Sequence, residues 1–301
     1  MNLRIRTCTH RQPRSRRGFT LIELLVVIVI IGILMGLIIP AVMRAQSQVR
    51  MTAVSTEISQ LDQAIATFKG RFGIEPPSSL TIPVIATGWT AENRQKVLRV
   101  WDQFDFATCG GLGATASTPG VYPAAAVNLN GAECLVFFLG GLNSNPSGPA
   151  KLVGFSKNPR TPWSTVGENR DGPFYDRFDI DRLVDIDGDG AVEFLDSLPD
   201  QVLPLLYFSS QGKNYRKTNS ATAWDDFDVN GGMTNAADMS MIYVGADNKT
   251  PERAQGFQIV SPGPDGVYGV GGMYTDGSEL TAARSVEGDN ITNFSGGPLK
   301  K

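Results

Sequence analysis

A single carboxylate, Glu23, interrupts a nearly continuous apolar run that extends from Phe19 to Pro40. A carboxylate in such a segment costs roughly 2.5 kcal/mol or more on membrane insertion, so it is usually functional and needs a partner. Cleavage between Gly18 and Phe19 would create one, because the new α-amino group lies four residues from Glu23 on the same helical face. Within one helix or between neighbouring helices, the amine and the carboxylate could neutralise each other.

A second group of carboxylates, in the stretch 185–196, matches a calcium loop of the EF-hand type. Alternate aspartates supply oxygen, a glycine permits the sharp turn at position six, and a backbone carbonyl and two further acids follow. The predicted ligands are Asp185, Asp187, Asp189, Ala191, Glu193 and Asp196. The last position usually holds glutamate, so the shorter Asp196 weakens the expected site. An acidic surface turn held by Asx hydrogen bonds is the alternative.

Residue types also limit the catalytic chemistry. The only histidine, His10, precedes Gly18, so a chain cut there has none. That excludes Ser-His-Asp and Cys-His catalysis and histidine-ligated zinc in the cut chain. Paired carboxylates abound, and the sequence does not separate two catalytic acids from calcium ligands. We expect a protein that is not an enzyme.

Two cysteines, Cys109 and Cys134, remain after such a cut, because Cys8 also precedes Gly18. In an oxidising compartment outside the cytoplasm they can form one disulfide, since only one pairing is open to them. We predict this disulfide, and two buried thiols are the alternative.

The segment 1–18 is basic, with six arginines and no acid. The positive-inside rule keeps it in the cytoplasm and sends the C-terminal bulk across the membrane. A secretory signal is cut after its apolar region, whereas a cut after Gly18 precedes that region. Cleavage removes six of the 27 basic residues, which changes the net charge from −3 to about −9. That charge disfavours a nucleic-acid-binding surface and is compatible with binding divalent cations.

One long helix, from 19 to about 72, should position the N-terminal groups. Its first part, 19–43, is apolar all round and suits a membrane span, while Pro40 should kink or loosen it. Its second part, 44–75, is an amphipathic stalk, which we expect to dock on the chain's own head. A two-stranded coiled coil is the alternative, less favoured because the pattern covers under three heptads. The stalk's apolar residues recur at steps of three and four: Met51, Val54, Ile58, Leu61, Ile65 and Phe68.

The head, 76–301, is rich in glycine and proline, which predicts many turns and short strands. The expected class is α+β, a long helix packed on a loop-rich head with a small antiparallel sheet and an insertion at about 100–200. Thr90 should cap a helix that ends near Trp101. The run 133–139 is helix or strand. The run 202–209 is interrupted by Pro204, so a strand should begin there or lie at a sheet edge. Strands are also expected at 241–244 and 255–260.

The N-terminal residues resemble the signature of the type IV pilin and type II secretion pseudopilin superfamily. The matching features are a basic leader that ends in Gly18, Phe19 as the first mature residue, Glu23 as the fifth, and Pro40 further along. The resemblance extends over about residues 14 to 75. It implies a prepilin peptidase that cuts after Gly18 and N-methylates Phe19, and a subunit that assembles into a helical filament.

The C-terminal residues look like those of the major, G-type pseudopilins. The turn 261–266 has their Ser-x-Gly-x-Asp-Gly pattern, and an acidic segment follows at 287–294. In that family this region binds calcium, so the resemblance implies Asp265 and Asp289 as side-chain ligands, with backbone carbonyls completing the shell. This chain departs by inserting residues 273–286 between the two halves. A plain type I or II turn is the alternative.

We therefore expect a structural subunit of a type II secretion pseudopilus or related filament, with calcium at one or two sites. It would sit in the inner membrane, single-pass, with a cytoplasmic leader and a periplasmic head, and then enter the filament. The expected partners are prepilin peptidase, other pilin or pseudopilin subunits, the inner-membrane assembly platform and membrane lipid, but no nucleic acid. Alternatives are a type IV pilin for adhesion, motility or DNA uptake, and an anchored exported binding or hydrolytic domain that uses the signal only for export.

Overall fold

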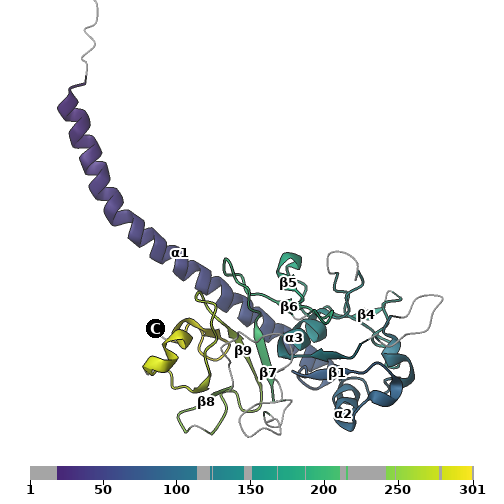
Figure 1. The fold of residues 1–301 in the computed structure, drawn as a ribbon. Coiled ribbons are helices and arrows are strands. Elements are labelled where there is room, and N and C mark those ends of the chain that lie inside the picture. Colours follow the sequence, from purple (N-terminus) through teal and green to yellow (C-terminus); the bar gives the residue numbers. More distant parts are fainter. Residues whose placement is uncertain are drawn as a thin grey trace, which may run out of the picture. The chain divides into compact units, whose positions relative to one another are not determined.

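The computed structural model describes residues 19–113, 123, 125–145, 151–167, 169–186, 188–210, 215, 242–247, 249–277 and 280–299. They fall into two compact parts, divided between Gln48 and Val49. The elements, in chain order, are α1 (Leu21–Phe72), β1 (Leu80–Ile82), η1 (Ala86–Gly88), α2 (Ala91–Val100), η2 (Phe106–Gly111), β2 (Val127–Leu129), α3 (Gly131–Gly140), β3 (Phe155–Ser156), β4 (Arg170–Asp171), η3 (Ile180–Arg182), β5 (Leu183–Val184), β6 (Glu193–Phe194), β7 (Leu206–Ser209), β8 (Tyr243–Val244), β9 (Phe257–Ser261), β10 (Gly272–Met273), η4 (Ala282–Asp289) and β11 (Ile291–Thr292) (Figure 1).

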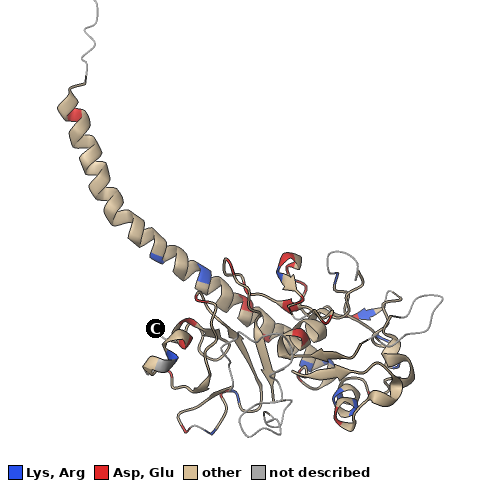
Figure 2. Cartoon of the chain, in the orientation of Figure 1, with Lys and Arg blue, Asp and Glu red and all other residues tan. Residues whose placement is uncertain are grey.

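The first part is the exposed beginning of α1. Every residue from Phe19 to Gln48 is exposed, and the most apolar 18-residue window of the helix has a mean hydropathy of 3.2. Charged residues are sparse along it (Figure 2). The helix is therefore long and apolar enough to cross a membrane. Pro40 lies inside it, and helical residues continue on both sides.

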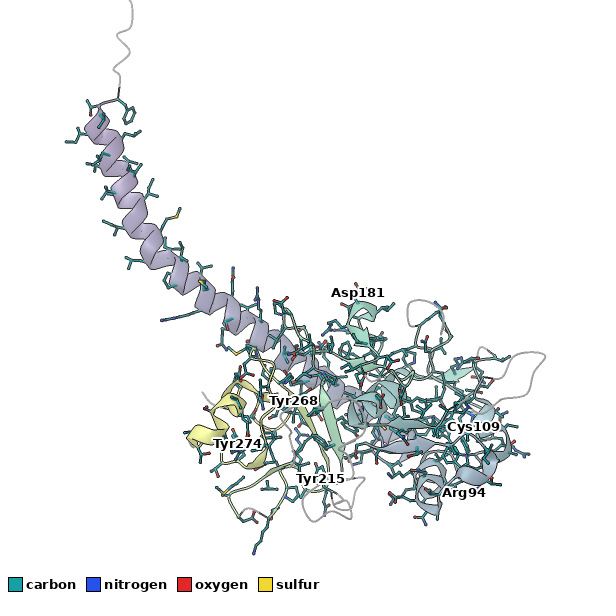
Figure 3. The ribbon with its side chains drawn as sticks, viewed as in Figure 1. Arg94, Cys109, Asp181, Tyr215, Tyr268 and Tyr274 are labelled. Carbon is teal, nitrogen blue, oxygen red and sulfur yellow. The ribbon has the colours of Figure 1, made fainter. Side chains whose placement is uncertain are left out.

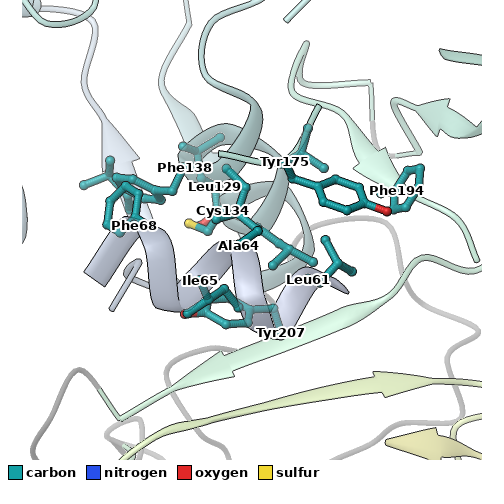
Figure 4. Close-up of a cluster of buried hydrophobic side chains, with 14 of the residues drawn as sticks. Leu61, Ala64, Ile65, Phe68, Leu129, Cys134, Phe138, Tyr175, Phe194 and Tyr207 are labelled. Atoms are coloured by element: carbon teal, nitrogen blue, oxygen red, sulfur yellow. The ribbon is translucent and has the colours of Figure 1, made fainter. Parts of the chain in front are cut away.

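The second part begins with the remainder of α1, which packs into the core of the head. The predicted stripe is buried from Val54 to Phe68, at steps of three and four residues. Phe68 meets the edge of Phe138 on α3, with ring centroids 5.8 Å apart. Each such fully buried apolar side chain contributes roughly 1.5–3 kcal/mol. Docking of the stalk on its own head is thus confirmed. Figure 4 shows Leu61, Ala64, Ile65 and Phe68 facing Leu129, Cys134, Phe138, Tyr175, Phe194 and Tyr207.

Two shorter helices start at caps that their sequences supply. Thr90 accepts a hydrogen bond from the backbone N–H of Asn93 at 3.2 Å, which confirms the predicted start of α2. The run 133–139 is helical, in α3. Asn130 accepts from the Glu133 N–H at 3.0 Å, and the Glu133 carboxylate accepts from the Asn130 N–H at 2.6 Å. This capping box decides for helix over strand.

The sheets are small, and most are antiparallel. The largest has the order β11–β9–β7, in which Tyr207 pairs with Ile259. As expected, β7 begins just after Pro204 and lies at an edge. The pairs β1–β2, β3–β4 and β5–β6 are antiparallel, whereas β8 and β10 are parallel. The α+β class with a small antiparallel sheet is confirmed, and the parallel pair was not foreseen.

The predicted disulfide between Cys109 and Cys134 is wrong, because both residues are buried thiols. Cys109 lies in η2, labelled in Figure 3, and burial raises its pKa to about 12. Cys134 lies on α3, where its thiol donates to the Leu129 carbonyl at 3.7 Å. Cys109 is packed into the core by η2 and Cys134 by α3. The prediction relied on an oxidising compartment, which says nothing about whether two distant segments bring their cysteines together.

Candidate functional site

The N-terminal site is organised by Thr20, a residue that the charge pattern alone did not reveal. The Thr20 N–H and hydroxyl both donate to the Glu23 Oε2 at 2.9 Å, and the Glu23 N–H donates to the Thr20 Oγ at 3.3 Å. This is a reciprocal cap of the Thr-x-x-Glu type at the start of α1. Phe19 is exposed next to it, while Gly18 lies outside the described residues. The T-x-x-E spacing was the signal that could have predicted this cap.

The first calcium candidate, 185–196, begins with a hairpin loop that joins two strands rather than two helices. Strands β5 and β6 pair across this loop, so Glu193 lies in β6 and Asp196 lies just after it. The Asp185 carboxylate accepts from the N–H groups of Gly188 at 2.7 Å and Gly190 at 3.1 Å. Asp189 accepts from the Ala191 N–H at 2.8 Å. These are Asx-type bonds to the loop's own backbone.

The remaining acids of the pattern are buried or lie outside the described residues. Glu193 is fully buried and accepts from the Ile186 N–H at 3.1 Å. Asp187 lies outside the described residues. Asp196 accepts from the Ser261 hydroxyl at 2.5 Å and the Leu198 N–H at 2.9 Å. Within the described part of the chain, no three Asp, Glu, Cys or His side chains gather as a metal cluster.

The second candidate, Asp265 with Asp289, is brought together by the fold. The Asp265 N–H donates to the Asp289 Oδ2 at 3.1 Å, although residues 273–286 separate the two halves. Gly263 makes this approach possible. Its φ is +69°, and a Cβ there would lie 2.4 Å from the Asp289 carbonyl oxygen, so any side chain would collide with that backbone.

The inserted residues fold against the same region. Arg284 donates to both oxygens of Glu287, at 2.8 and 2.5 Å, and Glu287 is fully buried. The Val270 N–H also donates to Glu287, at 3.2 Å. The insertion thus holds the segment that leads into Asp289 by a buried, charge-assisted contact.

The electrostatics of the Asp265–Asp289 pair favour a cation. Burial, and then the negative charge of Asp265, raise the pKa of Asp289, and burial raises the pKa of Asp265. Among the described residues, neither carboxylate has a salt bridge to lysine or arginine. Carboxylate oxygens are hard donors of the kind that calcium prefers, so these two side chains fit as ligands of a calcium ion.

Comparisons with known proteins concern the N-terminal segment. The family described as "Prokaryotic N-terminal methylation motif" matches residues 13–39. Type II secretion system core protein G of Pseudomonas aeruginosa is 41% identical over 58 residues, which are 19% of this chain and 41% of that protein. The protein of the same name from Klebsiella michiganensis is 41% identical over 56 residues, 19% of this chain and 39% of that protein.

The chain therefore spans about two-fifths of the length of the curated relatives it matches. No solved structure matches it. The predicted resemblance is confirmed where it was strongest: the N-terminal segment carries the prepilin-type methylation motif and is similar to the G-type pseudopilins.

Proposed function

We propose that this chain is a membrane-inserted precursor that is cut after Gly18 and becomes a subunit of a type II secretion pseudopilus or related pilus-like filament. The match of residues 13–39 to the methylation motif carries this proposal, supported by the 41% identity to core protein G over 58 residues. Prepilin peptidase, other pilin or pseudopilin subunits, the inner-membrane assembly platform and membrane lipid are its partners. The role is structural and not enzymatic.

The mechanism follows from the groups at the start of α1. The arginines of 1–18 keep the leader in the cytoplasm. The apolar helix anchors the subunit in the inner membrane, with the head in the periplasm. Cleavage frees the Phe19 amine, which pairs with Glu23 of a neighbouring subunit. Both Thr20 bonds end on Glu23 Oε2, so Oε1 can accept from that ammonium while the cap persists.

The second half of α1 is part of the head. Residues from Val54 to Phe68 belong to the head's core, so the head and this half of α1 would enter a filament as one unit. The apolar residues before Gln48 are exposed along the helix and would pack against other subunits. In this proposal the filament core is built by the first half of α1.

Calcium is the proposed cofactor, at Asp265 and Asp289. The support is the close approach of the two residues, which Gly263 permits, together with the raised pKa values of both carboxyl groups. Backbone carbonyls would complete the coordination, because calcium takes six to eight oxygens. A second site in 185–196 stays a prediction from the sequence.

The experiment that tests processing is mass spectrometry of the N-terminal peptide from native membranes. We expect a chain that begins with N-methylated Phe19. A chain that still begins at Met1, in cells with active prepilin peptidase, would contradict the proposal and leave an anchored exported domain.

Assembly is tested with Glu23→Gln, which keeps the size of the side chain and removes its charge. We expect normal cleavage and head stability, but no filaments by electron microscopy and no secretion. Thr20→Ala is the matched variant, which removes the cap and keeps the charge, so it should retain assembly. Surface fibres made while secretion is unaffected would instead favour a type IV pilin, and full function of Glu23→Gln would favour the anchored domain.

A further inference from the structure

Asp196 is a buried acid to which the proposed mechanism gives no role. It is 1% exposed and lies just after β6, the second strand of the hairpin. Its Oδ2 accepts from the Ser261 hydroxyl at 2.5 Å and from the Gln201 side-chain amide at 3.3 Å. One carboxylate oxygen, Oδ2, is therefore directed at the turn that follows β9, while Oδ1 accepts from the Leu198 N–H at 2.9 Å.

Ser261 and Gln201, the two side chains that donate to Asp196, also form hydrogen bonds with the Gly263 backbone. Because Ser261 uses its only hydroxyl proton on Asp196, its oxygen is left to accept, and it accepts from the Gly263 N–H at 3.2 Å. Gln201 donates to the Gly263 carbonyl at 3.3 Å as well as to Asp196. Both hydrogen-bonding groups of the Gly263 backbone are thus fixed by side chains that Asp196 orients.

Gly263 in turn lies directly against Asp289. A Cβ on Gly263 would stand 3.0 Å from the Asp289 carboxyl carbon and 2.4 Å from its carbonyl oxygen. Two residues later, the Asp265 N–H donates to the Asp289 Oδ2. The position of Gly263 therefore sets the distance between the two carboxylates of the candidate calcium site.

We propose that Asp196 is a positioning residue for calcium at Asp265 and Asp289, acting through Ser261, Gln201 and Gly263. This proposal rests on the proposed calcium site. Groups behind the ligands of a metal site hold those ligands in their binding orientation, and their loss typically lowers metal affinity 10–100-fold. Asp196 occupies the twelfth position of a calcium-loop pattern, yet its role is to support a different loop, 65 residues away in sequence.

The test is calcium titration by calorimetry of the full-length protein in detergent, with thermal unfolding in EDTA measured on the same samples. Asp196→Asn should bind calcium about tenfold more weakly and unfold in EDTA near the wild-type temperature, because burial already disfavours the ionised form of Asp196. Asp289→Asn is the reference ligand variant and should lose calcium binding. Asp247→Asn is the matched control, because Asp247 lies in an exposed turn with no predicted calcium ligand, where it accepts from the N–H groups of Lys249 and Thr250, and it should bind as the wild type does.

A double-mutant cycle separates positioning from a general structural role. Ser261→Ala breaks the same path, so the variant with both changes should bind no more weakly than either single variant. Additive losses would overturn the proposal, as would wild-type affinity in Asp196→Asn and Ser261→Ala while Asp289→Asn is impaired. Normal calcium binding by Asp289→Asn would instead refute the calcium site itself. If Asp196→Asn failed to fold, Ser261→Ala alone would decide, with the same two outcomes.

Discussion

The two acidic loops of the head, 185–190 and 263–266, have similar residues but different surroundings. The first is the tip of a two-stranded hairpin, where Gly188 and Gly190 have positive φ and open space around them. The second lies against Asp289 and is reached by Ser261 and Gln201. Aspartate and glycine make a turn in either place, but only contacts from distant segments hold carboxylates at a set separation.

The largest effect should come from Gly263→Ala. The new Cβ would meet the Asp289 backbone, so we expect a loss of about 3 kcal/mol in the free energy of unfolding, from steric overlap and the left-handed φ together. Gly190→Ala is the control, because it has φ of +95° and nothing within 4 Å. It should cost about 1 kcal/mol. Denaturant unfolding followed by tryptophan fluorescence measures both, and equal losses would remove the contrast between the loops.

The next effect concerns where calcium stabilises the head. Saturating calcium, at about 100 times its Kd, should add about 2.7 kcal/mol of stability to the wild type. Asp289→Asn should abolish most of the resulting rise in unfolding temperature, whereas Asp189→Asn should keep it. A loss of half the rise in each variant would instead indicate two calcium sites, one in each loop.

A smaller loss of stability should come from removing the salt bridges that join each loop region to the stalk. At the base of the hairpin, Arg182 pairs with Glu57 at 2.5 Å and lies over the Phe194 ring, with both charged groups partly buried. Glu57→Gln should therefore cost about 2 kcal/mol in the free energy of unfolding, since it leaves the Arg182 guanidinium with only the more distant Asp179 carboxylate, 3.9 Å from its Nε.

The corresponding tie of the C-terminal segment is the pair of Arg253 with Asp62, at 3.4 Å and more exposed. Asp62→Asn should change the free energy of unfolding by about 0.5 kcal/mol or less. Chemical denaturation of the two variants side by side measures this difference, and a larger loss in Asp62→Asn would reverse the ranking.

The smallest effect should be on pH dependence. The raised pKa values of Asp265 and Asp289 mean that protons compete with calcium at a pH above the ordinary aspartate value of 3.8. Without calcium the sign is opposite: these groups stabilise the fold below their unfolded pKa and lose that contribution as pH rises through the folded pKa. Unfolding temperatures across the acid range, with calcium and with EDTA, should therefore converge on acidification. In Asp289→Asn the two curves should nearly coincide at every pH.

Sequence reasoning succeeded where the signal was local. The stalk stripe from Val54 to Phe68, the Thr90 cap and the strand start after Pro204 all depend on residues within a few positions of one another. It failed for Cys109 and Cys134, because a disulfide depends on two distant segments meeting with suitable geometry. It left the run 133–139 open, because the deciding Asn130 lies just outside that run.

The sequence by itself determined the long helix, its isolated Glu23 and the prepilin-type signal. It also determined that the first half of this helix is apolar and exposed. Each of these depends on composition and periodicity among neighbouring residues. Only the tertiary structure decided which acids work together. Asp196 has the spacing of a loop ligand, but the hydrogen-bond donor nearest to it is Ser261, on a strand far along the chain. Side-chain partners are set by strand pairing and burial across the whole head, and that information is not contained in any single motif.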